Sequence, residues 1–418
     1  MPDVSLSDLA DMIKRHKPGY TLEAPFYSSE SIFKTDMDLI FGRHWIFVAT
    51  EPEVPEPGDY ITIAIGTTSV IILRDDDGGV RAFHNVCRHR GARLLHETQG
   101  SVGNIVCRYH QWIYAPDGKL LMADHMGEDF DRSCFGLKPV HLENLAGLLF
   151  ICLADEAPRD FDHLRSVMEP YLAPHQLWNC KVAKVDELVE QGNWKLTMEN
   201  NRECYHCAGS HPELTQSLFE YGFGFAPRDL DEETLTLAHD YACIQEERTA
   251  GWEAEGLPSR LVEEMVDRPT AYRAQRLALS GAGESQTRDT KAACTRLLGD
   301  FQRADLGGLH FWTAPNSWHH FMSDHIVTFS ATPIGPNRTL LRTTWLVHKE
   351  AREGRDYDLE NLTAVWTATN DQDGALVGMA QQGAESAGYQ PGPYSPHTED
   401  LVDKASRWYL QRLTAELA

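Results

Sequence analysis

The sequence predicts an α+β protein with two parts, a small all-β domain followed by a larger α+β domain that contains an antiparallel sheet. In the first third of the chain, β-branched runs at 60–65 and 69–73 are joined by a short turn, which is typical of a hairpin. Strand-like segments return at 309–314, 325–333 and 339–348, before two helical stretches that end the chain. A chain of 418 residues is long enough for two or three packed domains.

A helical lead-in, residues 1–45, precedes the all-β domain, and Leu6, Leu9 and Ile13 recur in it at helical spacing. We expect this lead-in to pack against the second part. Residues 46–160 form the all-β domain, with further strands at 80–84 and 147–153.

The second part spans residues 161–418. It is predicted to open with a strand at 182–191 and a helix at 194–207, followed by a mostly helical insertion at about 213–305. The chain then ends in the three strands given above and in helices at 357–383 and 398–416.

Composition excludes several functions. The net charge of −24 comes without any basic stripe, which argues against nucleic acid. No apolar run approaches the ~20 residues of a membrane helix, and the N-terminus lacks the features of a signal peptide. We therefore expect a cytoplasmic protein with no membrane contact. Its nine cysteines should be reduced, and the seven outside the motif below should be buried.

Two short motifs each combine a thiolate with an imidazole, Cys87 with His89 and Cys107 with His110. Two Cys and two His can hold a [2Fe–2S] cluster with both cysteines on one iron and both histidines on the other. Zinc is the alternative, but zinc sites usually pair Cys with Cys and His with His. The mixed spacing favours iron–sulfur.

A second group of ligand types begins at His206 and His211, five residues apart. On an ideal helix they would lie about 140° apart, so the helix must widen or end between them. Two imidazoles and one carboxylate form the facial triad of non-haem Fe(II) enzymes. Asp371 and Asp373 are the candidate carboxylates, and because they lie about 200° apart on a helix only one can face the metal. A zinc site remains the alternative.

The motifs resemble those of the Rieske-type non-haem iron oxygenases, in the segments 85–94, 107–112 and 117–119. Segments 192–196 and 389–395 extend the resemblance to the oxygenase components of glycine betaine monooxygenase and stachydrine (proline betaine) demethylase. The resemblance implies a Rieske domain and a helix-grip-like catalytic domain, with a [2Fe–2S] cluster and a mononuclear Fe(II).

The resemblance also implies a role for single residues. It assigns Asp373 rather than Asp371 to the iron, because the family carries Asn-x-x-Asp here and Asn370 completes that pattern. It makes Glu203 the bridge that carries electrons from a cluster histidine of a neighbouring subunit to the iron site. The implied ligands are Cys87, His89, Cys107 and His110 for the cluster, and His206, His211 and Asp373 for the iron.

The implied activity is oxidation of an N-methyl group of a small quaternary ammonium compound, which releases formaldehyde. O₂ is the oxidant, and a separate NAD(P)H-dependent flavin and iron–sulfur reductase supplies electrons. Glycine betaine is the first candidate substrate, followed by stachydrine or hydroxyproline betaine, and the family suggests a homotrimer. The alternative is an aromatic-ring dioxygenase or O-demethylase with the same metals. A departure from the relatives' pattern at 285–291 leaves the substrate open.

A quaternary ammonium group cannot donate a hydrogen bond, so aromatic faces should recognise it through cation–π contacts. We expect these faces to come from Tyr205, Trp312, Trp318 and Phe321. Ordinary core packing is the alternative for each of them.

Overall fold

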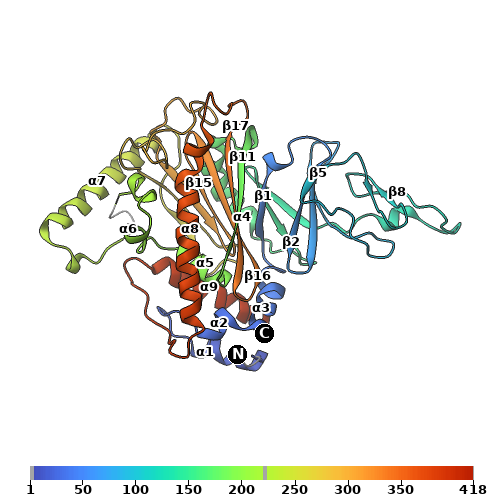
Figure 1. Ribbon diagram of the computed structural model, residues 1–418, viewed down its shortest axis with the longest axis horizontal. Helices are drawn as coiled ribbons and strands as arrows, with labels where there is room; N and C mark the ends of the chain where they lie inside the picture. Colours follow the sequence, from blue (N-terminus) through green and yellow to red (C-terminus); the bar gives the residue numbers. More distant parts are fainter. Residues whose placement is uncertain (1–3, 220–223, 418) are drawn as a thin grey trace.

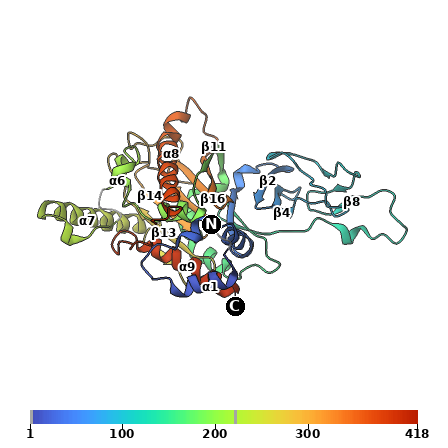
Figure 2. The same cartoon turned by 60° about the horizontal axis from the view of Figure 1, so that its bottom comes forward.

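The structure, a computed structural model, describes residues 4–219 and 224–417. A β-rich lobe and a larger lobe around a long sheet lie side by side (Figure 1). In the turned view of Figure 2 the β-rich lobe still projects away from the helices α7, α8 and α9. The two lobes therefore meet along one side only.

The β-rich lobe contains a four-stranded and a three-stranded sheet, in the orders β4-β3-β2-β5 and β6-β7-β8. Successive side chains of its strands point to opposite faces of the sheet. Ile71 and Leu73 fill the core of this lobe together with Trp112. The strands are β2 Asp59–Ile65, β3 Thr68–Arg74, β4 Val80–His84, β5 Gln99–Ser101, β6 Ile105–Val106, β7 Ile113–Tyr114 and β8 Leu120–Met122.

A third small sheet, β1-β10-β9, joins this lobe to the larger one. The backbone of Phe47 in β1 donates to Asn316 Oδ1 at 3.1 Å, and Asn316 Nδ2 donates back to its carbonyl oxygen at 2.9 Å. This reciprocal pair fixes the small sheet against the end of the long one. The strands are β1 Ile46–Thr50, β9 His141–Leu145 and β10 Leu148–Cys152.

The larger lobe is built on a seven-stranded antiparallel sheet in the order β11-β17-β16-β15-β14-β13-β12. The long helix α8 runs along it and contacts β11, and α5 packs between α8 and β16 (Figure 1). The strands are β11 Cys180–Glu190, β12 Val262–Glu264, β13 Tyr272–Leu277, β14 Gly308–Thr313, β15 Ser317–Phe321, β16 His325–Gly335 and β17 Arg338–His348.

The helices at the two ends of the chain pack together. Leu9 and Met12 of α1 share one buried cluster with Leu410 and Leu413 of α9. Ser5 starts α1 with a capping box, in which its side chain and that of Asp8 satisfy free backbone N–H groups. The principal helices are α1 Leu6–Arg15, α2 Ala24–Ser28, α3 Glu30–Thr35, α4 Phe161–Leu172, α5 Trp194–Asn201, α6 Cys207–Ser210, α7 Glu232–Ala254, α8 Leu359–Ala384 and α9 Asp400–Leu417.

The α+β fold class is confirmed, but the mostly helical insertion is helical only in its first half. Helix α7 lies there as expected, whereas β12 and β13 extend the long sheet and 278–305 is mainly loop. The alternation of β13, with Tyr272, Ala274 and Arg276 buried, is that of a strand. Polar side chains occur on both faces, with Arg276 among the buried residues and Arg273 and Gln275 between them, which hid the pattern. No helix in the described part of the chain is long and apolar enough to span a bilayer.

The expectation for the cysteines is wrong at four positions. Cys204 and Cys207 form a disulfide, and Cys134 and Cys243 are exposed rather than buried. Cys-x-x-Cys at the start of a short helix brings the two sulfur atoms within bonding reach, with Cα atoms 4.9 Å apart.

Candidate functional site

The two Cys/His loops of the β-rich lobe have matching backbone turns. Cys87 N–H donates to the Ala92 carbonyl, and Cys107 N–H donates in the same way to that of Trp112, both at 2.8 Å. Each turn passes through a left-handed residue, Gly91 at φ +75° and Gln111 at φ +58°. This pair of turns brings the two short motifs face to face.

The residues of these loops fit a [2Fe–2S] cluster. Both cysteines are buried, and burial raises the pKa of the Cys107 thiol. The imidazole rings of His89 and His110 lie 4.4 Å apart between centroids, and His89 Nδ1 is buried with no hydrogen-bond partner. Tyr114 adds its hydroxyl, 3.3 Å from Cys87 Sγ. An orphaned buried ring nitrogen beside two buried thiols is a donor set that a metal cluster would satisfy.

In the larger lobe, His206 and His211 lie at the two ends of the short helix α6, as its N-cap and C-cap. The predicted helix at 194–207 ends earlier, because α5 stops at Asn201, so both imidazoles are free to turn inward. Asp373 Oδ1, on α8, lies 3.3 Å from His206 Nε2 and 3.1 Å from His211 Nε2. Asp371 is exposed to solvent.

Each histidine is oriented by an acceptor at its other ring nitrogen. His206 Nδ1 lies 2.5 Å from Glu203 Oε1, and His211 Nδ1 lies 2.8 Å from Gln372 Oε1. If both Nδ1 atoms carry the proton, both Nε2 atoms present lone pairs toward Asp373, which is the arrangement a metal ligand needs. The Nε2 of His211 and the Oδ1 of Asp373 have no hydrogen-bond partner.

The two imidazoles and the carboxyl group of Asp373 shift one another's pKa. Burial acts to lower the pKa of His206, but the neighbouring carboxylates of Asp373 and Glu203 outweigh it and raise the pKa to about 9. Burial likewise acts to raise the pKa of Asp373, but the two neighbouring imidazoles outweigh it and lower that pKa. Cys207 Sγ also lies near both ring nitrogens, but its bond to Cys204 occupies the sulfur. The two imidazoles and the carboxylate are therefore the available donors, and they fit a divalent iron.

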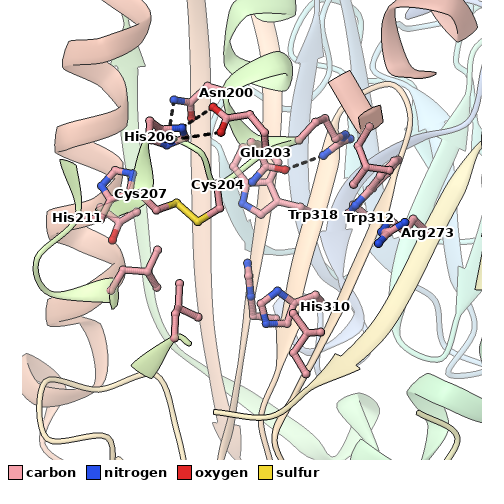
Figure 3. Close-up of a pocket in the computed structure, with 18 of the residues that line it drawn as sticks. Asn200, Glu203, Cys204, His206, Cys207, His211, Arg273, His310, Trp312 and Trp318 are labelled. Atoms are coloured by element: carbon pink, nitrogen blue, oxygen red, sulfur yellow. Dashed lines mark hydrogen bonds and ion pairs between the residues drawn. A yellow bond between two sulfur atoms is a disulfide. The ribbon is translucent and has the colours of Figure 1, made fainter. Parts of the chain in front are cut away.

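A cavity of about 400 Å³ opens beside these residues (Figure 3). Trp312 and Trp318 line it as expected, together with Trp366, which the sequence reasoning missed. Tyr205 is 69 % exposed and does not line the cavity. Phe321 points to the opposite face of the sheet and packs in the other core, so the structure does not support it as a pocket residue.

Several further polar residues of the cavity were not predicted. Gln286, from the segment at which the chain departs from its relatives, accepts a hydrogen bond from Trp366 Nε1 at 3.1 Å and leaves its own Nε2 unpartnered. Arg202 also lines the cavity, and burial lowers its pKa to about 9, which leaves it charged at neutral pH. One indication of its role was available in the sequence, which is that Arg202 directly precedes Glu203.

Comparison with known proteins covers nearly the whole chain. Residues 177–415 match the family described as the ring hydroxylating alpha subunit (catalytic domain), and residues 44–138 match the Rieske [2Fe-2S] domain. The glycine betaine monooxygenase oxygenase subunit of Chromohalobacter salexigens is 44% identical over 412 residues, which is 97% of this chain and 90% of that protein.

Solved structures show the same fold. A quaternary ammonium Rieske monooxygenase in complex with L-carnitine superposes with a TM-score of 0.69 at 22% identity, covering 96% of this chain and 98% of the other. Naphthalene 1,2-dioxygenase from Rhodococcus reaches the same TM-score at 18% identity, covering 99% of each chain. The fold therefore does not discriminate between the two substrate classes. The chain belongs to the alpha subunits of the Rieske non-haem iron oxygenases, oxidoreductases that combine a [2Fe–2S] cluster with a mononuclear iron.

Proposed function

We propose that this protein is the oxygenase subunit of a monooxygenase that removes an N-methyl group from a small quaternary ammonium compound, with glycine betaine as the first candidate. The observation that carries the proposal is the pair of inward-facing histidines with Asp373 at the wall of a cavity lined by tryptophans. The identity of 44% to a glycine betaine monooxygenase subunit over nearly the full length supports the choice of substrate. Stachydrine and hydroxyproline betaine follow as candidates.

The proposed metal ligands are the residues named from the sequence. Residues 46–160 would hold the cluster through Cys87, His89, Cys107 and His110, and residues 161–418 would hold the iron through His206, His211 and Asp373. When bound, the iron supplies the activation of O₂ and the cluster supplies single electrons.

The protein's own contribution is orientation and exclusion of water. Glu203 and Gln372 hold the two imidazoles in the tautomer that leaves Nε2 free. The buried faces of Trp318 and Trp366 make one wall of the cavity apolar, so an N-methyl group can rest there beside the ligand cluster. Water would otherwise compete for this position.

We further propose that Glu203 bridges electron transfer between subunits of a homotrimer. The cluster loops lie in the lobe that projects away from α6, so one chain does not bring its own two sites together (Figure 1). The side chain of Glu203 is 13 % exposed, so part of it is accessible to a neighbouring chain. The reductase is proposed to be an NAD(P)H-dependent flavin and iron–sulfur protein, and its use of NAD(P)H places the pair in the cytoplasm.

The test is formaldehyde release by the purified protein with NADH, a compatible reductase and O₂. Glycine betaine, stachydrine and hydroxyproline betaine are compared with carnitine and with a panel of arenes. We expect formaldehyde with glycine betaine and no diol from any arene. Arene oxidation without formaldehyde from any betaine would overturn the proposal in favour of a ring-hydroxylating or O-demethylating enzyme.

A further inference from the structure

Arg202 is unusual among the charged residues of the cavity because it forms no ion pair within the described parts of the chain, 4–219 and 224–417. The described lining residues include four other charged side chains, and each of them has a charged or ionisable partner. The pairs are Glu203 with His206, Arg273 with Glu263, Asp373 with His206 and His211, and Asp400 with Lys404. The cavity thus holds one uncompensated positive charge.

The groups that the Arg202 side chain contacts, as the structure describes them, are neutral. The residue is 3 % exposed. Its Nη1 donates to Asn201 Oδ1 at 2.6 Å, and its Nη2 donates to the Thr313 carbonyl oxygen at 3.4 Å. A guanidinium group has five N–H donors, so these two acceptors leave capacity unused. A buried charge without a partner is costly, and an anion that enters the cavity recovers part of that cost.

The position of the guanidinium is fixed by Trp312. Arg202 Cζ lies 4.0 Å from the centroid of the Trp312 ring, which is a cation–π contact. Figure 3 shows Trp312 on the side of the cavity away from His206 and His211, with Trp318 between them. In this view the ring that the guanidinium covers and the candidate iron ligands lie on different sides of Trp318.

We propose that Arg202 binds the carboxylate of the substrate and so directs its N-methyl groups toward His206, His211 and Asp373. This inference rests on the proposed function and deepens it, because it restricts the substrate to quaternary ammonium compounds that carry a carboxylate. Guanidinium groups bind carboxylates with two parallel charge-assisted hydrogen bonds, which fix orientation as well as affinity.

The assignment changes the role expected for Trp312. Since Arg202 covers its ring, Trp312 holds the carboxylate-binding group in place and does not face the ammonium. The ammonium end is left to Trp318 and Trp366. An unsubstituted arene offers nothing to Arg202, so this charge disfavours the ring-hydroxylating alternative.

The first test uses the unmodified holoenzyme and two ligands of nearly the same shape, glycine betaine and its methyl ester, which has no negative charge. Binding is measured by anaerobic calorimetry, so no turnover is needed. We expect the ester to bind on the order of 10²-fold more weakly, the usual penalty for leaving a buried charge unpaired. Equal affinities would overturn the role of Arg202 alone. Binding of neither compound would overturn the proposed substrate as well.

The second test uses variants of the chain. Arg202→Met should reduce the preference for glycine betaine over its ester to near unity, with the ester itself bound about as well as before, and Arg202→Lys should restore part of the preference. Arg273→Met is the matched control, because this arginine lines the same cavity but is paired with Glu263, and we expect it to keep the wild-type preference. Equal losses for both ligands in Arg202→Met would show a structural role and contradict the proposal.

Discussion

Two regions of this protein each present a pair of imidazoles, and they differ in access. In the cluster loops His110 is exposed and the two cysteines are buried behind it. In the iron site His211 is buried and lines a cavity. A centre that passes electrons to another protein has to come near the surface, whereas one that oxidises a C–H bond has to exclude water. The surroundings of the histidines thus decide whether they serve electron transfer or the oxidation of a C–H bond.

The largest expected effect is the loss of the mononuclear iron with the [2Fe–2S] cluster left in place. Asp373→Ala removes the carboxylate from the iron site, so iron should fall from about three to about two atoms per chain, the two of the cluster. Formaldehyde release should fall to background while the visible spectrum of the cluster stays intact. Metal analysis and absorbance check both.

Asp371→Ala is the matched control, because Asp371 lies two residues away on α8 and is exposed. Its iron content and turnover should equal those of wild type. A normal iron content in Asp373→Ala would remove Asp373 as a ligand.

The next effect concerns the link between the regions. Glu203→Gln keeps an acceptor for His206 Nδ1 but removes the charge. We expect both metals to remain bound and turnover to fall by about 10- to 100-fold, the range typical of groups that support a metal ligand. Unchanged turnover with full metal content would contradict the bridging role.

A smaller effect is expected in the cluster loops. Tyr114→Phe removes the hydroxyl 3.3 Å from Cys87 Sγ. Hydrogen bonds to cluster sulfurs help set the potential. One bond of about 1 kcal/mol corresponds to about 40 mV for a one-electron couple, so the potential should fall by that amount. Voltammetry measures it, and an unchanged potential would show that the hydroxyl does not donate to the sulfur.

The last effect is one of stability near the iron site and not of metal content or turnover. Burial raises the pKa of Glu190 from 4.5 to about 7. The folded state therefore binds this proton more tightly than the unfolded state, and stability is lost as the pH rises from 4.5 to about 7. Glu190→Gln should leave stability unchanged at low pH and raise it by up to about 3 kcal/mol above neutral pH.

Urea unfolding at about pH 5 and about pH 8 tests this sign. Glu187→Gln, on the same strand but with a 57 % exposed side chain, is the control for loss of one charge. A Glu190→Gln variant less stable than wild type at the higher pH would contradict the assignment.

The two regions also differ in how far the sequence predicts them. The cluster loops follow short, regular strands, so Cys87, His89, Cys107 and His110 were readable from local spacing alone. The iron site combines α6 with α8, and His211 and Gln372 are 161 residues apart, so Asp373 needed the family resemblance. Strand β13 was missed because polar residues occur on both of its faces, including the buried Arg276.

The cavity was the least predictable part. Phe321 and Trp318 lie on opposite faces of one strand, and the sequence alone does not say which of the two faces lines the cavity. Arg202 was missed because its importance comes from the absence of a partner, which is a property of packing and not of a motif.

The central claim is that the cluster supplies electrons and that the chemistry occurs at His206, His211 and Asp373. A single-turnover experiment tests it directly: the cluster is reduced, the reductant is removed, and O₂ is added with glycine betaine while absorbance and formaldehyde are followed. We predict that the cluster in wild type is reoxidised with formaldehyde release, and that the cluster in Asp373→Ala stays reduced over the same time without formaldehyde. Reoxidation with formaldehyde at the wild-type rate in Asp373→Ala would contradict the account.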